Sequence, residues 1–326
     1  MIFPQFNMNL LQIVTLVSTF YNVYSYTYEC ENNYEADEFC LITLYSYYVD
    51  PEICKMHFPE LESIKLQQVR FLTPRILFRM TAVKQLDISH SEIALAYLKP
   101  GLEYLRISRS QLQSLIIDPY EPNQLMELYL PENQLVRLPK HLNQLKNLTF
   151  LDLSDNRLSY LDLNDFSGLE NLTTVVMYQN NIHVVFSSTE VKLQSLQELN
   201  LSNNGLQVLD IARLDAPILN DLDLSSNKLS KVESLAERYL ILANINLEKN
   251  PLDCSWVESL SSHKNKNNTF DCIQPLEQEA FVSAFKQETA ARSLLEKTLH
   301  QIVINRSALS YDIESILDDL MCKLFE

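Results

Sequence analysis

Apolar and polar residues recur in the same order along most of the chain. Residues 148–158 read LTFLDLSDNRL and residues 219–229 read LNDLDLSSNKL, the same arrangement of leucines and polar residues. The template L-x-x-L-x-L-x-x-N-x-L fits nine segments, whose starts follow one another at steps of 19 to 24 residues. These starts are Leu61, Val83, Leu102, Leu125, Leu148, Leu172, Leu196, Leu219 and Leu242.

This period and consensus are typical of a leucine-rich repeat. Within each copy, x-L-x-L-x predicts a short strand whose leucines point inward and whose other residues point outward, because side chains alternate along a strand. Nine such strands stacked about 4.8 Å apart would form a curved parallel sheet roughly 40 Å long. The predicted fold class is therefore an α/β solenoid, a leucine-rich repeat horseshoe of about nine repeats over residues 61–253.

The ninth template position predicts a buried polar column. It is Asn in six successive copies, and a buried Asn side chain can donate and accept hydrogen bonds where each coil turns. The first three copies carry Val69, Ser91 and Ser110 there, which predicts a less regular start near the capped end of the solenoid. The asparagines are Asn133, Asn156, Asn180, Asn204, Asn227 and Asn250.

Composition narrows the possible functions. The 326 residues carry a formal net charge of −16, which argues against nucleic acid or an anionic membrane as a partner. Only three glycines occur, so no glycine-rich phosphate cradle can form. The six histidines lack the spacing of a metal site, and no Gly-x-Ser-x-Gly elbow is present. We therefore expect no enzymatic activity, no cofactor and no metal.

The N-terminus predicts export. Residues 1–25 contain an apolar stretch over residues 10–20 and end in the sequence Val-Tyr-Ser, which is typical of a secretory signal peptide. The alternative is that this stretch is an apolar strand of the mature protein. No other segment supplies the roughly 20 apolar residues that a membrane span requires. The expected product is a secreted, extracellular protein without a membrane span.

Five Asn-x-Ser/Thr sequons agree with export. Asn200 lies on a predicted strand, where a glycan would cover the sheet, so we do not expect it to be used. The expected glycosylation sites are Asn147, Asn171, Asn267 and Asn305.

The cysteines lie at the two ends of the solenoid, and none lies in the repeats. The ends are where a secreted solenoid needs disulfides to hold its caps. The sequence CENNYEADEFC places a polar turn between two apolar-aromatic flanks. It predicts a hairpin closed by a disulfide between Cys30 and Cys40, within an N-terminal cap over residues 26–60.

At the other end, NPLDCSW over residues 250–256 resembles the C-terminal flanking cap of extracellular leucine-rich repeat proteins. The resemblance implies a cap over residues 254–275 with one bridge, between Cys254 and Cys272. Cys54 and Cys322 are left over. They could pair with each other only if the tail folded back over the solenoid, they could form an intermolecular disulfide, or each could be buried and reduced.

Residues 276–326 contain neither Gly nor Pro, and their apolar residues recur at steps of three and four. This pattern predicts a helical coiled-coil tail, about 44 residues and roughly 65 Å long. Arg292, Arg306 and Glu288 interrupt the seam and favour a partner that offers complementary charges. The alternative is a helix that packs on its own solenoid. The seam residues are Leu295, Leu299, Ile302, Leu309, Ile313, Ile316 and Leu320.

The outward positions of the predicted strands run from basic in the early repeats, through an aromatic belt, to acidic in the late repeats. Exposed aromatic and arginine side chains are the types that anchor protein interfaces. Solvated strands also often carry tyrosine and charge, so a purely solvated face is the alternative. The candidate binding residues on the concave face are Arg106, Arg109, Tyr104, Tyr129, Phe150 and Tyr178.

With CENNYEADEFC, the Asn-type repeats, NPLDCSW and the 281–324 heptads in this order, the chain resembles the mosquito leucine-rich immune proteins. The resemblance implies an innate-immune recognition or scaffold protein of the haemolymph. It also implies disulfide-linked dimers, homo- or hetero-dimeric, and association with a complement-like thioester protein. The tail here predicts one short coil and the cap has few cysteines, so this would be a short form. The alternative is an extracellular-matrix or cell-surface adhesion protein of the same repeat class.

Overall fold

The computed structural model describes residues 26–31, 39–44, 61–69, 72, 74–232, 235, 244–261 and 272, the first two segments by their backbone. Several predictions fall outside these residues and stay predictions. They are the signal peptide over residues 1–25, the roles of Cys54 and Cys322, glycosylation at Asn267 and Asn305, and the helical tail over residues 276–326.

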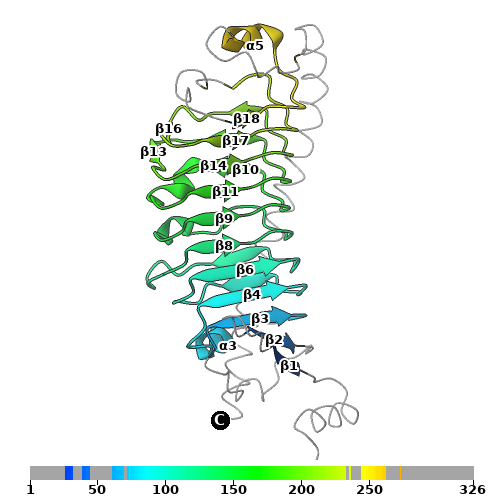
Figure 1. The fold of residues 1–326 in the computed structure, drawn as a ribbon, viewed down its shortest axis with the longest axis vertical. Coiled ribbons are helices and arrows are strands. Elements are labelled where there is room, and N and C mark those ends of the chain that lie inside the picture. The colour runs from blue at the N-terminus through cyan, green and yellow to red at the C-terminus, as the bar shows by residue number, and fades with distance from the viewer. Residues whose placement is uncertain are drawn as a thin grey trace, which may run out of the picture.

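One eleven-stranded sheet runs through the described chain (Figure 1). Its first two strands form an antiparallel hairpin, and from the second strand onward each strand pairs in parallel with the next. Nine of these strands come one from each repeat, which confirms the predicted solenoid. The strands are β1 (Tyr26–Glu31), β2 (Phe39–Leu44), β3 (Ser63–Gln67), β4 (Gln85–Ser89), β6 (Tyr104–Ser108), β8 (Glu127–Tyr129), β9 (Phe150–Asp152), β11 (Thr174–Val176), β14 (Glu198–Asn200), β17 (Asp221–Asp223) and β18 (Asn244–Asn246).

Shorter elements connect these strands. We call the exposed side of the large sheet the sheet face, which is the surface predicted to be concave, and the outward side of the three-stranded sheet β10-β12-β15 the back face. The connecting strands are β5 (Leu95–Tyr97), β7 (Ser114–Ile116), β10 (Tyr160–Asp162), β12 (Val184–Phe186), β13 (Val191–Lys192), β15 (Val208–Leu209) and β16 (Leu214–Asp215). The helices are α3 (Pro74–Arg79), the 3-10 helices η1 (Leu142–Gln144) and η2 (Leu163–Phe166), and α5 (Cys254–Ser261).

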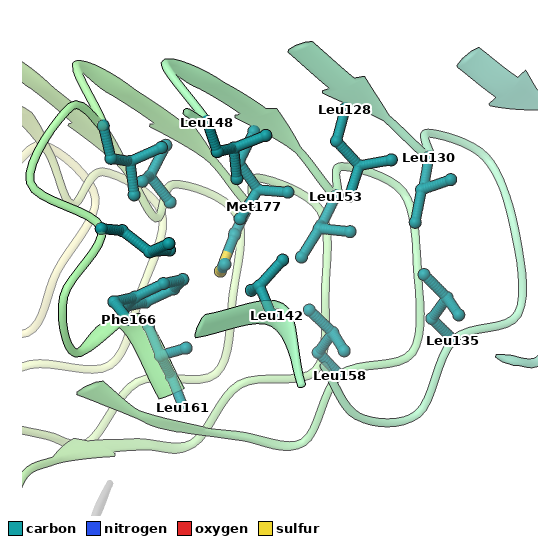
Figure 2. Close-up of a cluster of buried hydrophobic side chains, with 14 of the residues drawn as sticks. Leu128, Leu130, Leu135, Leu142, Leu148, Leu153, Leu158, Leu161, Phe166 and Met177 are labelled. Carbon is teal, nitrogen blue, oxygen red and sulfur yellow. The ribbon is translucent and has the colours of Figure 1, made fainter. Parts of the chain in front are cut away.

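The template leucines form one core that extends through the coils (Figure 2). Leu128 and Leu151 occupy the centres of β8 and β9 and are fully buried, while their strand neighbours stay partly exposed. Phe166 from η2 enters the same core. Each fully buried leucine contributes about 1.5–3 kcal/mol, so every repeat adds its own increment and stabilises mainly its neighbours.

The asparagine column forms as predicted. In the sixth repeat, the Asn180 amide nitrogen donates to the carbonyls of Leu153 at 2.9 Å, Met177 at 3.2 Å and Tyr178 at 3.3 Å. Its oxygen accepts from the Leu158 N–H at 3.0 Å. The other five asparagines make equivalent bonds to the preceding coil and to their own turn.

The column continues into the early repeats through serine. The Ser110 hydroxyl accepts from the Ser91 N–H at 3.3 Å, and the Ser91 hydroxyl accepts from the Val69 N–H at 3.0 Å. Each hydroxyl also donates to the carbonyl two residues before it. A serine side chain makes fewer hydrogen bonds than an asparagine side chain, so the early repeats are less regular, as predicted.

The turn after each of the nine repeat strands contains a left-handed residue that the template did not predict. The residue before each ladder position has φ between 50° and 57°, and none of the nine is glycine. This conformation costs of order 1 kcal/mol or more outside glycine, so the bonds of the ladder hold the turn in place. The residues are Gln68, His90, Arg109, Glu132, Asp155, Gln179, Asn203, Ser226 and Lys249.

Candidate protein-binding face

The sheet face presents two exposed columns of side chains, because every second strand residue points outward and the strands are in register. The first column is Ser63, Gln85, Tyr104, Glu127, Phe150, Thr174, Glu198, Asp221 and Asn244. The second is Lys65, Asp87, Arg106, Tyr129, Asp152, Val176, Asn200, Asp223 and Asn246.

Three predicted aromatic residues meet at the centre of this face. Tyr104 and Phe150 lie in the first column and Tyr129 lies between them in the second. The ring centroids of Tyr104 and Tyr129 are 5.3 Å apart, and those of Tyr129 and Phe150 are 4.7 Å apart in a stacked arrangement. We call these three residues the aromatic strip. Aromatic pairs of this kind add about 0.5–1.5 kcal/mol beyond their buried area, so the strip is a rigid apolar surface.

The hydroxyl groups of the strip are held by charged neighbours. The Tyr129 hydroxyl donates to Glu127 Oε2 at 2.9 Å. Burial raises the pKa of Tyr129 well above its usual range, and the contact with Glu127 adds to the rise. Burial also raises the pKa of Tyr104, an effect that the positive charge of Arg106 opposes. Both phenols are therefore neutral at physiological pH and present hydrogen-bonding edges.

The early end of the face is less basic than predicted, because carboxylates accompany its cations. Arg109 Nε lies 2.7 Å from Glu132 Oε2, and this contact lowers the pKa of Glu132. Lys84 Nζ likewise lies 2.9 Å from Oε1 of Glu62 in the preceding repeat. Lys65 Nζ lies 3.8 Å from Asp87 Oδ2. Exposed Arg106, beside the aromatic strip, is the main cation left facing outward.

The late end is acidic, as predicted, and contains a hollow of about 440 Å³ over β14, β17 and β18. Leu199, Leu222 and Ile245 at the strand centres also line it. Amide groups donate to the acids: Asn220 Nδ2 donates to the adjacent Asp221 Oδ2 at 3.1 Å, and Asn246 Nδ2 donates to Asp223 Oδ2 of the preceding coil at 3.4 Å. The polar lining consists of Glu198, Asn200, Asp221, Asp223, Asn244 and Asn246.

Two predicted binding residues lie at the rim and not on the strands. Arg109 follows the end of β6 and occupies a left-handed turn. Tyr178 lies two residues beyond β11, where its carbonyl accepts from the Asp155 N–H at 3.0 Å, and its ring takes no part in the aromatic strip. The sequence predicted that the three residues of the aromatic strip lie on the face, but it did not predict that their rings contact one another. The pairing of neighbouring strands decides which rings meet.

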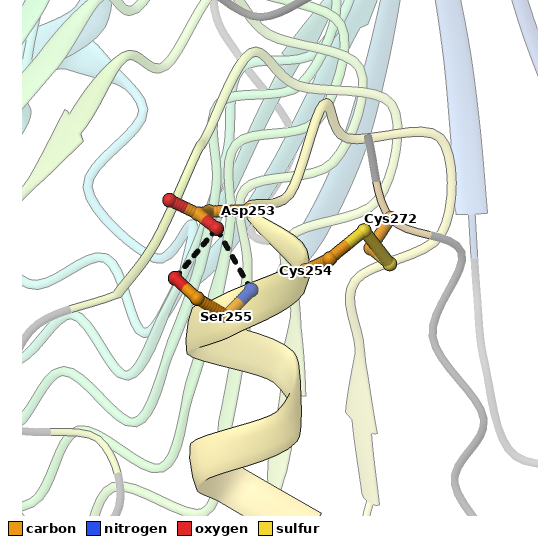
Figure 3. The surroundings of a disulfide bond; sticks show 4 residues. All are labelled: Asp253, Cys254, Ser255 and Cys272. Carbon is orange, nitrogen blue, oxygen red and sulfur yellow. Dashed lines mark hydrogen bonds between the residues drawn. A yellow bond between two sulfur atoms is a disulfide. The ribbon is translucent and has the colours of Figure 1, made fainter. Parts of the chain in front are cut away.

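The C-terminal cap carries the predicted bridge. Cys254 and Cys272 form a disulfide with their Cα atoms 4.9 Å apart (Figure 3). Asp253 precedes helix α5 and accepts from the Ser255 N–H at 2.8 Å and the Ser255 hydroxyl at 2.7 Å, which caps the helix. Trp256 packs against the end of the core. Together these residues cover the last layer of leucines.

In the N-terminal hairpin, the register places Cys30 directly opposite Cys40. The hairpin predicted from CENNYEADEFC is confirmed, and the disulfide between the two cysteines stays a prediction.

The described sequons differ in accessibility. Asn147 and Asn171 are exposed at the same position of successive repeats, and the Asn171 amide donates to the Lys146 carbonyl at 2.9 Å. Asn200 lines the acidic hollow, and its oxygen accepts from the Ser202 N–H and hydroxyl. Use of Asn147 and Asn171 stays a prediction that their exposure favours.

Within the part of the chain that the structure describes, no group of three His, Cys, Asp or Glu side chains is placed to hold a metal ion. No helix among the same residues is long and apolar enough to cross a membrane.

Comparison with known proteins supports the same architecture. Two family models, both described as leucine-rich repeat, match residues 123–182 and 195–215. Human leucine-rich repeat-containing protein 66 is 30% identical over 178 residues, covering 47% of this chain and 20% of its own length. The zebrafish transforming growth factor beta activator LRRC33 is 26% identical over 266 residues, covering 71% of this chain and 38% of its own length. This chain thus spans well under half of either relative.

Among solved structures, the crystal structure of the LRIM1/APL1C complex superimposes with a TM-score of 0.55 at 14% identity, covering 90% of this chain and 74% of that one. At this identity the likeness establishes the fold alone. The described chain is a leucine-rich repeat solenoid with a disulfide-closed C-terminal cap and an aromatic strip at the centre of its sheet face.

Proposed function

We propose that this chain is a secreted, non-enzymatic recognition or scaffold protein of innate immunity that binds another protein through its sheet face. The observation that carries the proposal is the aromatic strip. Tyr104, Tyr129 and Phe150 form a partly exposed apolar cluster in the middle of a mostly polar face. Binding hot spots are enriched in Tyr and Arg and lie near the centre of an interface, surrounded by polar contacts.

The surroundings of the strip favour a protein partner. Arg106 lies on one side, and Asp152 and the acidic hollow lie on the other. A partner surface with an apolar projection, an acid near Arg106 and bases over the hollow would be complementary in charge. Nucleic acid would meet net repulsion over most of this face, because the chain as a whole is strongly acidic.

The partner proposed first is a complement-like thioester protein, the association implied by the resemblance to mosquito leucine-rich immune proteins. We also propose that the chain dimerises, with itself or with a second leucine-rich repeat chain, through the helical tail and Cys54 or Cys322. The solved LRIM1/APL1C complex supports this second proposal, since it joins two chains of the same fold. Secretion into haemolymph and glycosylation at Asn147 and Asn171 belong to the same proposal.

The binding proposal is tested by the affinity of the secreted protein for a purified complement-like thioester protein, measured by surface plasmon resonance. Tyr129→Ala should weaken binding by about 2 kcal/mol, or roughly thirtyfold in Kd. Tyr120→Ala is the matched control, because Tyr120 is 94% exposed and lies outside the sheet face. Equal affinity of the two variants for the partner would show that the aromatic strip is not part of the interface.

The dimer proposal is tested separately by the mass of the secreted protein in light scattering, with and without reductant. A dimer that reduction converts to a monomer supports a covalent link, and Cys54→Ser and Cys322→Ser then identify the thiol. A monomer under both conditions contradicts homodimerisation. Binding of immobilised extracellular-matrix proteins in place of the thioester protein would support the adhesion alternative.

A further inference from the structure

The back face carries an exposed apolar patch that the repeat template does not require. Tyr160, Phe186 and Val208 come from the three adjacent strands β10, β12 and β15 and are 43%, 37% and 57% exposed. The rings of Tyr160 and Phe186 are stacked, with centroids 6.4 Å apart. Val184 lies in line between Tyr160 and Val208. We call these four residues the back patch.

Charged residues end the back patch in both directions along the solenoid axis. The position of Tyr160 is taken by Arg137 in the preceding repeat, and the position of Val208 is taken by Lys231 in the following one, both exposed. Asp162 pairs with Phe186 in the sheet, and Asp210 lies one coil further on. An apolar patch three coils long with charged residues at both ends has the composition of an interaction site.

The size of the patch indicates what covers it. Four partly exposed side chains present on the order of 300 Å², whereas a stable interface between separate proteins buries about 800 Å² on each partner. A segment tethered to the same chain needs less area, because its effective concentration is about millimolar. The occupant is therefore expected to belong to this chain.

We propose that the predicted tail helix docks its seam residues Leu295, Leu299 and Ile302 on the back patch. Successive coils of the solenoid are about 4.8 Å apart. Successive seam residues of a helix are three or four residues apart, or about 5 Å at 1.5 Å per residue. A helix lying along the solenoid axis thus places one seam residue over each coil of the patch.

The tail has the reach for this position. It follows Cys272, which the disulfide fixes at the C-terminal cap. The four coils from β18 back to the repeat of β9 span about 19 Å, which about 13 helical residues cover.

Docking of this kind makes the tail self-inhibited. A seam that covers the back patch is unavailable to another chain until a partner helix displaces it. The inference rests on the predicted helix of the tail, and it is independent of the aromatic strip on the sheet face. Loss of binding by strip variants would therefore leave it untouched.

A first test uses the unmodified protein. Lys231 lies at the edge of the patch, and Lys297 lies in the sequence between the seam residues Leu295 and Leu299. An amine-reactive cross-linker is applied to a mixture of unlabelled and isotopically labelled protein, and the linked peptides are identified by mass spectrometry. We expect Lys231–Lys297 links within single chains. Links that join labelled to unlabelled chains would assign the patch to a second copy, and absence of links between Lys231 and the tail would overturn the docking.

A second test uses variants of the full chain. Phe186→Asp with Val208→Asp should raise the rate of tryptic cleavage in the tail at least about tenfold, since cleavage follows the undocked population. Leu299→Asp should have the same effect, and combining the changes should add nothing further. Ile218→Asp is the control, because Ile218 is 49% exposed outside the patch. Wild-type cleavage rates in the patch variant, with an unchanged thermal transition, would overturn the proposal.

Discussion

The asparagine ladder predicts a large loss of stability from a single small substitution. Asn180 is 7% exposed and makes four hydrogen bonds to backbone groups. Asn180→Ala leaves the buried Leu158 N–H without its partner, whereas the Leu153 carbonyl still accepts from Asn156 Nδ2 at 3.2 Å. An unsatisfied buried group costs about 1–3 kcal/mol, and three further side-chain hydrogen bonds are lost, so we expect the free energy of unfolding to fall by about 3 kcal/mol.

Two further variants make this prediction specific. Asn180→Ser should lose about half as much, because a serine at this position makes two such bonds in the early repeats, as Ser110 does. Asn181→Ala changes the adjacent, exposed asparagine and should stay within about 0.5 kcal/mol of the wild type. Urea denaturation followed by circular dichroism measures all three. If Asn180→Ala costs no more than Asn181→Ala, the ladder bonds do not stabilise the coil.

Three other outcomes follow from described contacts. Gln179 has φ 55°, so Gln179→Gly should slightly raise the midpoint of thermal unfolding. The β-branched Gln179→Val should lower the midpoint, because it reduces the free energy of unfolding by more than about 1 kcal/mol. Cys254→Ser removes the bridge across 18 residues and should cost about 3 kcal/mol in chemical denaturation, a loss that reductant reproduces in the wild type only. Burial raises the pKa of Asp155 above its usual value of 3.8, and the negative charges of Glu132 and Asp152 add to the rise. The folded state therefore binds this proton more tightly than the unfolded state, so stability falls as pH rises from the unfolded pKa through the folded one. Asp155→Asn should remove this fall in thermal transitions measured from low to neutral pH, and an unchanged pH profile would show that Asp155 does not cause it.

The repeat itself is readable from the sequence because its information is local. Each coil carries its own strand, leucines and ladder residue, and each contacts mainly its neighbours. The nine parallel strands, the asparagine column and the Cys254–Cys272 bridge were therefore predictable. The left-handed turns were not, because the template leaves the position before the ladder residue open, and here it holds Gln, His, Arg, Glu, Asp, Asn, Ser or Lys. A polar residue directly before the ladder position is the signal that could have indicated them.

Which side chains meet across coils was decided by the tertiary structure. Steps between repeats vary from 19 to 24 residues, and only the strand register shows that Tyr129 lies between Tyr104 and Phe150. The same register places Glu132 beside Arg109 and so neutralises a charge that the sequence alone assigned to a basic end. The back patch likewise requires the pairing of β10, β12 and β15. Sequence determined the contents of each coil, since that pattern is local, and stacking determined the surfaces, since they form between coils.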